Sequence, residues 1–371
     1  MAVLYIFIAF MILLFMITVH EFGHYIAAKA LKFRVEEFSV GIGKAIYKKK
    51  RKNGEVFSIR LIPLGGFCMF AGDDDLDNKL GDNRPKTFEK EEDKDYIPFN
   101  KQAPWKRLIV LFSGGFANLI CAVIFAVVFL MVFGYHHNVK VTDLDPAVAH
   151  HQFQEGDIIQ SIENKKGEYK SFTFTNSFMA QLNNYDKIGD TFTVKVLRDV
   201  DGNGVLVPVD VTATIQRVAD DKGRYSSILA GAAGLKQQWI KLSFGNALGK
   251  AFVFTGELIW FMLTILGKLI TGQLSIFAIG GPFTTVSIMS ELAMASLFNI
   301  LMLIPLISVN LGIFNLLPIP ALDGSRMVFT GIEWARGRPI NPNLEAKIHM
   351  IGLFVLLGLV LFLDIAYLFF R

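Results

Sequence analysis

Four long stretches of this sequence carry no charged side chain. They are residues 1–19, 108–134, 292–322 and 350–363, and the last continues beyond Asp364 with further apolar and aromatic residues. About 20 apolar residues in a helix cross the roughly 30 Å hydrocarbon core of a bilayer, so each stretch predicts one membrane-spanning helix. The uncharged start, with no basic segment before it, favours a retained span over a signal peptide.

A fifth apolar stretch, residues 251–270, differs from these four. Glu257 and Lys268 interrupt it and leave only ten uncharged residues between them. A segment of that kind is typical of a helix that lies at the membrane surface or re-enters from one side. The sequence therefore predicts four crossings.

Basic residues indicate which side of the membrane each loop occupies. Residues 32–60 contain nine Lys or Arg against three Glu, whereas residues 135–250 contain 13 basic and 13 acidic residues. Cytoplasmic loops carry an excess of Lys and Arg close to the spans. We expect both termini and residues 135–250 to be periplasmic, in a bacterial inner membrane, and the loops after the first and third spans to be cytoplasmic.

The segment between the second and third spans changes to the alternating pattern of strands. Runs rich in β-branched residues at 138–142, 157–162, 191–198 and 205–215 predict a small β-rich domain. Asp145-Pro146-Ala147 with residues 155–159 resembles the turn and strand of PDZ domains in membrane proteases. On the other side of the second span, residues 72–95 are rich in Asp and Glu, which is typical of a solvated loop.

Composition agrees with a membrane protein. Of the 371 residues, 52% are hydrophobic and only 19% are charged, below the roughly 25% usual in soluble domains. The two cysteines, Cys68 and Cys121, provide no disulfide framework. A net charge of +4 without a basic patch does not indicate nucleic-acid binding, and we expect neither a nucleic acid nor a nucleotide as partner.

The first span ends in a metal-binding motif. His20-Glu21-Phe22-Gly23-His24 is an H-E-x-x-H sequence, and residues i and i+4 of a helix share one face, so both imidazoles can reach one ion. Imidazole binds Zn²⁺ well, and Glu21 is then placed to take a proton from an activated water. Ionisable residues in a span are costly and rare, which favours a functional site over side chains that merely reach for the membrane surface.

A catalytic zinc site needs a third protein ligand and an open position. Asp323 is the first charged residue after 31 uncharged ones, and it follows Pro318 and Pro320, which must end the helix. With four crossings, the third span carries Asp323 to the side of the two histidines, whereas a crossing by residues 251–270 would carry it to the opposite side. We therefore expect Asp323 to be a zinc ligand. A helix-capping aspartate is the alternative.

The two motifs together resemble a known family. His20-Glu21-x-x-His24 followed by Asn315-x-x-Pro318-x-Pro320-x-Leu322-Asp323-Gly324 is similar to the paired motifs of site-two-type intramembrane metalloproteases. The segments 308–312, 64–67 and 280–282 look like the bacterial RseP branch (regulator of sigma-E protease). The resemblance covers nearly the whole chain, and it implies a zinc-dependent intramembrane endopeptidase that acts in regulated intramembrane proteolysis and the stress response.

The resemblance also implies how a substrate is bound. Residues 55–70 would form a membrane-associated β-hairpin whose edge pairs with an unwound substrate, and an ordinary cytoplasmic hairpin is the alternative. The implied substrate-binding residues are Asn310, Asn315, Pro318, Pro320, Phe57, Ser58, Ile59, Gly65 and Gly66. The implied substrates are single-pass membrane proteins, namely anti-sigma factors after a first external cut and remnant signal peptides.

The expected protein is an α-helical polytopic membrane protein with four transmembrane helices, a membrane-associated β-hairpin and one external β-rich PDZ-like domain. The best-known enterobacterial members of the branch carry two PDZ domains in tandem. The predicted segments are 1–30, 31–106, 107–135, 136–220, 221–290, 291–325, 326–347 and 348–371. The main functional alternative is a membrane receptor or transporter for metal or peptide. Clustering of the ionisable groups at one membrane face, beside Glu21, favours hydrolysis.

Overall fold

The computed structural model describes residues 2–73, 97–144, 152–173, 181–182, 189–202, 204–219, 225–229, 232–274 and 281–370. The chain forms two compact units. One unit combines Met1–Ala126 with Leu258–Arg371, and the other is Val127–Glu257. The expected acidic loop at 72–95 lies outside the described residues except for Gly72 and Asp73, as do Asp145-Pro146-Ala147 of the PDZ-like pattern and Gly280.

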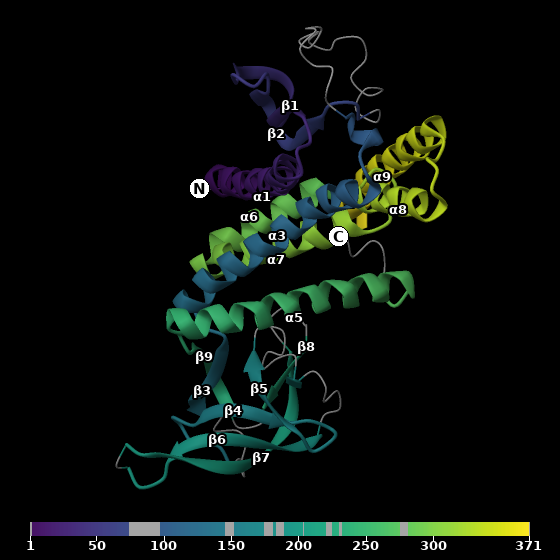
Figure 1. The fold of residues 1–371 in the computed structure, drawn as a ribbon. Coiled ribbons are helices and arrows are strands. Elements are labelled where there is room, and N and C mark those ends of the chain that lie inside the picture. Colours follow the sequence, from purple (N-terminus) through teal and green to yellow (C-terminus); the bar gives the residue numbers. More distant parts are fainter. Residues whose placement is uncertain are drawn as a thin grey trace. The chain divides into compact units, whose positions relative to one another are not determined.

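The protein is a helical multi-pass membrane protein with an added β region (Figure 1). Within the described residues, five helices are long and apolar enough to cross a membrane. They are α1 (Ala2–Ala30), α3 (Pro104–Val132), α5 (Phe244–Ile270), α7 (Leu297–Leu316) and α9 (Pro342–Phe370). Four of them correspond to the predicted spans. By length and composition α5 is a fifth candidate, whereas the sequence predicts that its apolar part lies at the membrane surface.

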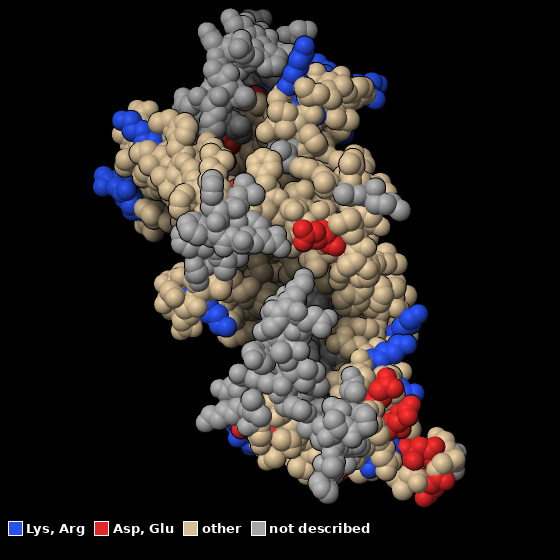
Figure 2. Space-filling model, turned by 180° about the vertical axis from the view of Figure 1, so that it is seen from behind, with Lys and Arg blue, Asp and Glu red and all other residues tan. Residues whose placement is uncertain are grey.

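Much of the surface of these helices suits contact with lipid. Large apolar side chains such as Phe112, Phe116 and Phe354 are exposed. Most of the helical surface visible in Figure 2 carries neither acidic nor basic side chains. Exposed apolar area of this extent is unusual in a soluble protein, and it is expected where hydrocarbon takes the place of water.

The third uncharged stretch is divided between helices, whereas the sequence predicts one span over 291–325. The short helix α6 (Pro282–Ala295) ends before Ser296, whose side chain caps α7 by accepting a hydrogen bond from the backbone N–H of Asn299. The helix α7 then ends at Leu316, before the two prolines. Asp323 begins another helix, α8 (Asp323–Arg336), which starts in the segment predicted as the third span and continues into the expected cytoplasmic loop.

Small residues allow the helices around α1 to pack closely. The helices α1, α3, α6 and α7 lie side by side (Figure 1). A Cβ atom added to Gly115 of α3 would lie 2.9 Å from the carbonyl oxygen of Gly312 on α7, so only glycine allows this approach. At the other end of α6, the buried Asp364 of α9 accepts hydrogen bonds from the backbone N–H groups of Phe283 and Thr284 and so caps that helix.

The strands β1 (Val35–Lys50) and β2 (Val56–Phe70) form a bent hairpin next to α1. The start of β1, residues 35–40, pairs on one side with residues 56–59 and on the other with residues 66–70 of β2. Residues 45–50 of β1 pair with the outer side of 56–60. The backbone at 56–59 therefore has partners on both sides, whereas the strand 66–70 pairs with β1 on one side.

Ion pairs hold the turn of this hairpin against the end of α1. The buried Glu55 forms an ion pair with Lys29 at 3.0 Å and with Arg51 at 3.2 Å, and Arg51 also donates a hydrogen bond to the hydroxyl of Tyr25. Burial raises the pKa of Glu55, but hydrogen bonds from its neighbours outweigh this effect and lower the pKa below its usual value. The turn of the hairpin is thus connected to the end of α1.

The second unit contains one antiparallel sheet, with the described strands in the order β8-β7-β6-β4-β5-β3-β9. The strands are β3 (His136–Leu144), β4 (Ile158–Glu163), β5 (Tyr169–Thr173), β6 (Thr191–Asp199), β7 (Leu206–Ala219), β8 (Tyr225–Leu229) and β9 (Ala232–Trp239). All four predicted strands are present, and β5, β8 and β9 are additional. The core includes the fully buried Ile159, Phe172 and Val194.

Candidate metal centre

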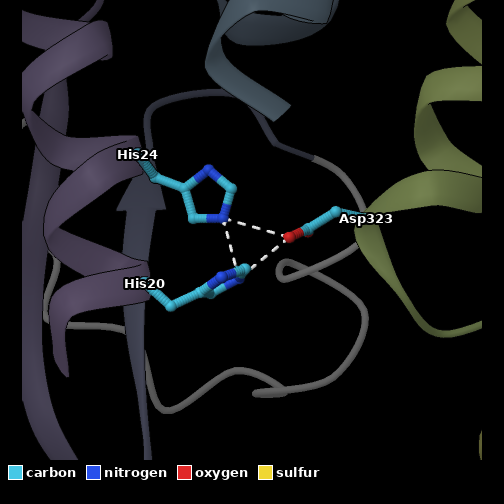
Figure 3. A group of neighbouring side chains, drawn as sticks. All are labelled: His20, His24 and Asp323. Carbon is cyan, nitrogen blue, oxygen red and sulfur yellow. Dashed lines mark hydrogen bonds and ion pairs between the residues drawn. The ribbon is translucent and has the colours of Figure 1, made fainter. Parts of the chain in front are cut away.

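Two histidines of α1 point to the same place because they are one helical turn apart. Both His20 and His24 are buried, and their Nε2 atoms lie 3.2 Å from each other. The Oδ2 atom of Asp323 lies 3.0 Å from Nε2 of His20 and 3.1 Å from Nε2 of His24 (Figure 3). The structure thus brings together the three ligands predicted from sequence, although Asp323 is 299 residues from His24.

Neighbouring helices fix the orientation of both rings. Nδ1–H of His24 donates a hydrogen bond of 2.7 Å to the backbone carbonyl of Val110 on α3, which leaves Nε2 as the ligand atom. The side-chain amide of Asn315, at the end of α7, lies 3.4 Å from Nδ1 of His20. Gly114 of α3 faces both rings, and a Cβ atom at this position would collide with them.

Asp323 reaches the histidines from the end of the loop that connects α7 to α8. It is the first residue of α8, and Gly324 after it lies against the carbonyl oxygens at the end of α7, where a side chain would not fit. Burial would raise the pKa of Asp323, but the two imidazoles hold it well below its usual range. A metal ligand must be ionised, and an aspartate carboxyl is ordinarily ionised at neutral pH.

The three ligand atoms fit a zinc ion. Zinc forms bonds of about 2.0–2.1 Å to nitrogen and oxygen, so the ligands of a tetrahedral ion are about 3.3 Å apart. The observed distances of 3.0, 3.1 and 3.2 Å are close to this spacing. Two imidazoles and one carboxylate form a donor set found in catalytic zinc sites, which keep a fourth position open. His20, His24 and Asp323 can therefore hold zinc.

Glu21 lines a pocket together with two of the three ligands, His20 and Asp323. The pocket is lined by Ile17, His20, Glu21, Leu311, Asn315, Ala321, Leu322 and Asp323. The carboxylate of Glu21 also accepts a hydrogen bond from the backbone N–H of Cys68 in β2. Cys68 is the partner of Phe38 of β1 in the ladder, so the strand 66–70 runs beside Glu21.

The expected substrate-binding residues lie at different distances from this pocket. Asn315 lines it, whereas Asn310 does not, although it also lies on α7. Pro318 and Pro320 belong to the loop between α7 and α8, and Pro320 packs against Gly352 of α9.

In the hairpin, Gly66 packs against the side chain of Glu21, and Gly65 precedes it. Phe57, Ser58 and Ile59 are different, because β1 already pairs with both sides of their backbone, and this pairing leaves no ladder edge there for a substrate. Ser58 is fully buried and donates a hydrogen bond to Glu37.

Sequence reasoning missed several residues that support the site. The backbone carbonyl of Val110 and the space left by Gly114 depend on how α3 packs against α1, which no local pattern reveals. Arg326, one turn after Asp323, forms an ion pair of 2.6 Å with the buried Asp73, just beyond β2. The sequence offered one signal for the Arg326–Asp73 pair, because Arg326 is the first basic residue after the Asp323 motif.

Comparison with known proteins agrees with the geometry of the centre. The family model for peptidase family M50 matches residues 8–359. The chain belongs to peptidase family M50. This M50 protein is an intramembrane metalloprotease of the site-two type, with zinc as its cofactor, as its sequence predicts.

The relatives match along most of their length. Metalloprotease MmpA of Caulobacter vibrioides is 29% identical over 93% of this chain and 90% of its own. Regulator of sigma-W protease RasP of Bacillus subtilis is 28% identical, over 92% of this chain and 93% of its own. Zinc metalloprotease RasP of Oceanobacillus iheyensis is 26% identical, over 93% and 94% respectively.

Proposed function

We propose that this M50 protein cleaves single-pass membrane proteins within or beside their spans, with zinc held by His20, His24 and Asp323 and with Glu21 as general base. The observation that carries the proposal is the meeting of the three ligand atoms, all within 4.8 Å of one another, at a pocket that His20, Asp323 and Glu21 line. Hydrolysis of a peptide needs an activated water and a base at one place; the three ligands would hold the metal that activates the water, and Glu21 would be the base.

Glu21 and Asn315, which both line the pocket, would act on the substrate. When bound, zinc would polarise the scissile carbonyl and make water acidic enough to attack at neutral pH. Glu21 would accept a proton from the attacking water as the new C–O bond forms, and would then donate it to the amine nitrogen as the C–N bond breaks. Asn315 would orient the substrate carbonyl by donating a hydrogen bond from its side-chain amide.

The outer edge of the strand 66–70 is the expected binding place for the substrate backbone. A transmembrane helix keeps its peptide bonds within its own hydrogen bonds, so the cleaved part must first unwind. The freed N–H and C=O groups need new partners, and an additional strand on a sheet edge supplies them. Gly66 packs against the side chain of Glu21, so a substrate strand paired with this part of β2 would lie near the general base.

The contacts at the centre also support four crossings. His24 near the end of α1 contacts Val110 near the start of α3, and Asp323 follows the end of α7, so these three ends share one side of the membrane. The segment between α3 and α7 must then cross an even number of times. A crossing by α5 would require a second one by α6, whose 14 residues are fewer than the roughly 20 needed. We therefore place α5 at the membrane surface.

The charge pattern suggests the orientation of these crossings. Nine basic residues in 32–60 follow α1, which favours a cytoplasmic position for the centre and a periplasmic one for the sheet of the second unit. The sheet would act as a PDZ-like filter or docking surface for substrates. A relative is named for sigma-W regulation, and this supports anti-sigma factors already cut outside, and remnant signal peptides, as the substrate class.

The test uses the full-length protein, purified in detergent, and a single-pass membrane protein as substrate. Glu21→Gln should bind zinc normally but cleave at least about 100-fold more slowly. Glu291→Gln, on the exposed surface of α6, is the matched control and should cleave normally. Removal of zinc by a chelator should abolish cleavage, and added zinc should restore it.

Normal cleavage by Glu21→Gln, or cleavage that persists without zinc, would overturn the proposal. Transport of zinc into liposomes by a protein that cleaves nothing would favour the receptor or transporter alternative instead.

A further inference from the structure

The loop that presents Asp323 contains a residue in an unusual conformation. Ala321 has φ of 79°, in the left-handed region, and among the described residues only one other non-glycine residue, Lys32, has a positive φ. This conformation brings the Cβ atom of an L-residue too close to the backbone, and it persists only where the surroundings hold it. Ala321 is two residues from Asp323, so its conformation determines where the carboxylate points.

His349 of α9 holds this conformation from the far side of the loop. Its Nδ1 atom accepts a hydrogen bond of 3.1 Å from the backbone N–H of Ala321. The ring is 3% exposed, and the ring of Phe329 on α8 packs edge-on against it, with centroids 5.6 Å apart. About one turn further along α9, Gly352 lies against Pro320 in the same loop, where a side chain would not fit.

We infer that His349 is a positioning residue of the metal centre, which acts on Asp323 through Ala321. The inference rests on the proposed role of Asp323 as a zinc ligand. Buried polar groups need partners, and the N–H of Ala321 lies in a loop whose prolines cannot supply a regular ladder. In the left-handed conformation of Ala321, this N–H donates its hydrogen bond to His349. Without it, the loop relaxes towards conformations that move the carboxylate away from the two histidines.

The inference distinguishes a hydrogen bond from packing alone. Glycine adopts positive φ without steric cost, so Ala321→Gly should make the loop less dependent on His349. Asparagine places an acceptor oxygen close to the position of Nδ1, whereas leucine fills the space without an acceptor. We therefore compare His349→Leu, His349→Asn, Ala321→Gly and the double variant His349→Leu/Ala321→Gly with the parent protein.

The measurement is the affinity of the metal-free, full-length protein for Zn²⁺, obtained by competition with a chelating dye. The visible absorption of the Co²⁺-loaded protein reports the geometry of the ligands, and thermal unfolding reports the fold. His349→Leu should bind Zn²⁺ about tenfold more weakly, the cost usually seen when a supporting partner of a ligand is lost. His349→Asn and the double variant should recover most of this loss, and Ala321→Gly alone should stay within about threefold of the parent.

Parent-like zinc affinity in a folded His349→Leu variant would overturn the inference. It would also be overturned if the double variant His349→Leu/Ala321→Gly recovered neither the zinc binding nor the folding that His349→Leu loses. Packing alone would then explain the role of His349. Asp323→Ala separates these outcomes from a failure of the proposed function. If that variant binds Zn²⁺ as tightly as the parent, Asp323 is not a ligand and the proposed function itself is wrong.

Discussion

Gly114→Ala tests whether the centre has the geometry described. The Cβ atom of alanine would lie 2.6 Å from Cε1 of His24 and 2.7 Å from Cε1 of His20. Carbon atoms in contact are usually about 3.5–4.0 Å apart, so the rings or the helix must move by about 1 Å. A misplacement of that size in an active site lowers the rate by about 10²-fold, which corresponds to roughly 2.7 kcal/mol in the barrier.

Two measurements on the purified protein follow this change. Zinc content, determined by elemental analysis after dialysis, should fall because both ligand nitrogens are displaced. Cleavage of a model membrane substrate should fall by the same 10²-fold order. Gly358→Ala on α9 is the matched control, since no atom lies within 4 Å of a Cβ atom there, and it should leave both quantities unchanged.

A Gly114→Ala variant with full zinc content and full activity would show that α3 does not limit the positions of the histidines. The orientation of His24 by Val110 would then lose its support as well, because the same packing of α3 on α1 places both groups.

Two further substitutions test contacts between elements of the membrane unit by thermal unfolding. Asp364→Ala removes the cap of α6 and should cost about 1 kcal/mol, with Asp364→Asn costing less; equal values for both variants would contradict the capping role. Arg326→Gln leaves the 1% exposed Asp73 without its ion-pair partner and should cost about 3–5 kcal/mol. Adding Asp73→Asn should recover more than half of that loss, and no recovery would mean that the pair is not the cause.

The sequence was most informative where ionisable side chains stand next to long apolar stretches. His20, His24 and Asp323 stand out because ionisable residues at the ends of uncharged stretches are costly, and the structure brings all three together. Each of the four main apolar stretches contains a long helix, because composition alone determines which segments suit hydrocarbon. Predictions of this kind need no knowledge of tertiary contacts.

Features that depend on tertiary contacts between distant segments could not be predicted from the sequence. Gly41 and Gly43 have φ of 84° and 86°, where the pairing of β1 shifts from one part of β2 to another, and this bend encloses residues 56–59 instead of leaving them at an edge. Ser296 divides an uncharged stretch that hydropathy reads as continuous. The partnership of His349 with Ala321 joins residues 28 positions apart across two helices, and no local pattern encodes it.

The separation of the zinc ligands along the chain has a consequence for assembly. An ion held by α1 and the start of α8 ties the first helix to the last third of the polypeptide across 299 residues. Such an ion acts as a staple, because it binds the folded arrangement and not the dispersed helices, and its binding energy adds to the stability of the fold. A newly made copy that has not yet acquired its metal should therefore hold its N-terminal helix less firmly, and be easier to degrade, than a copy that has.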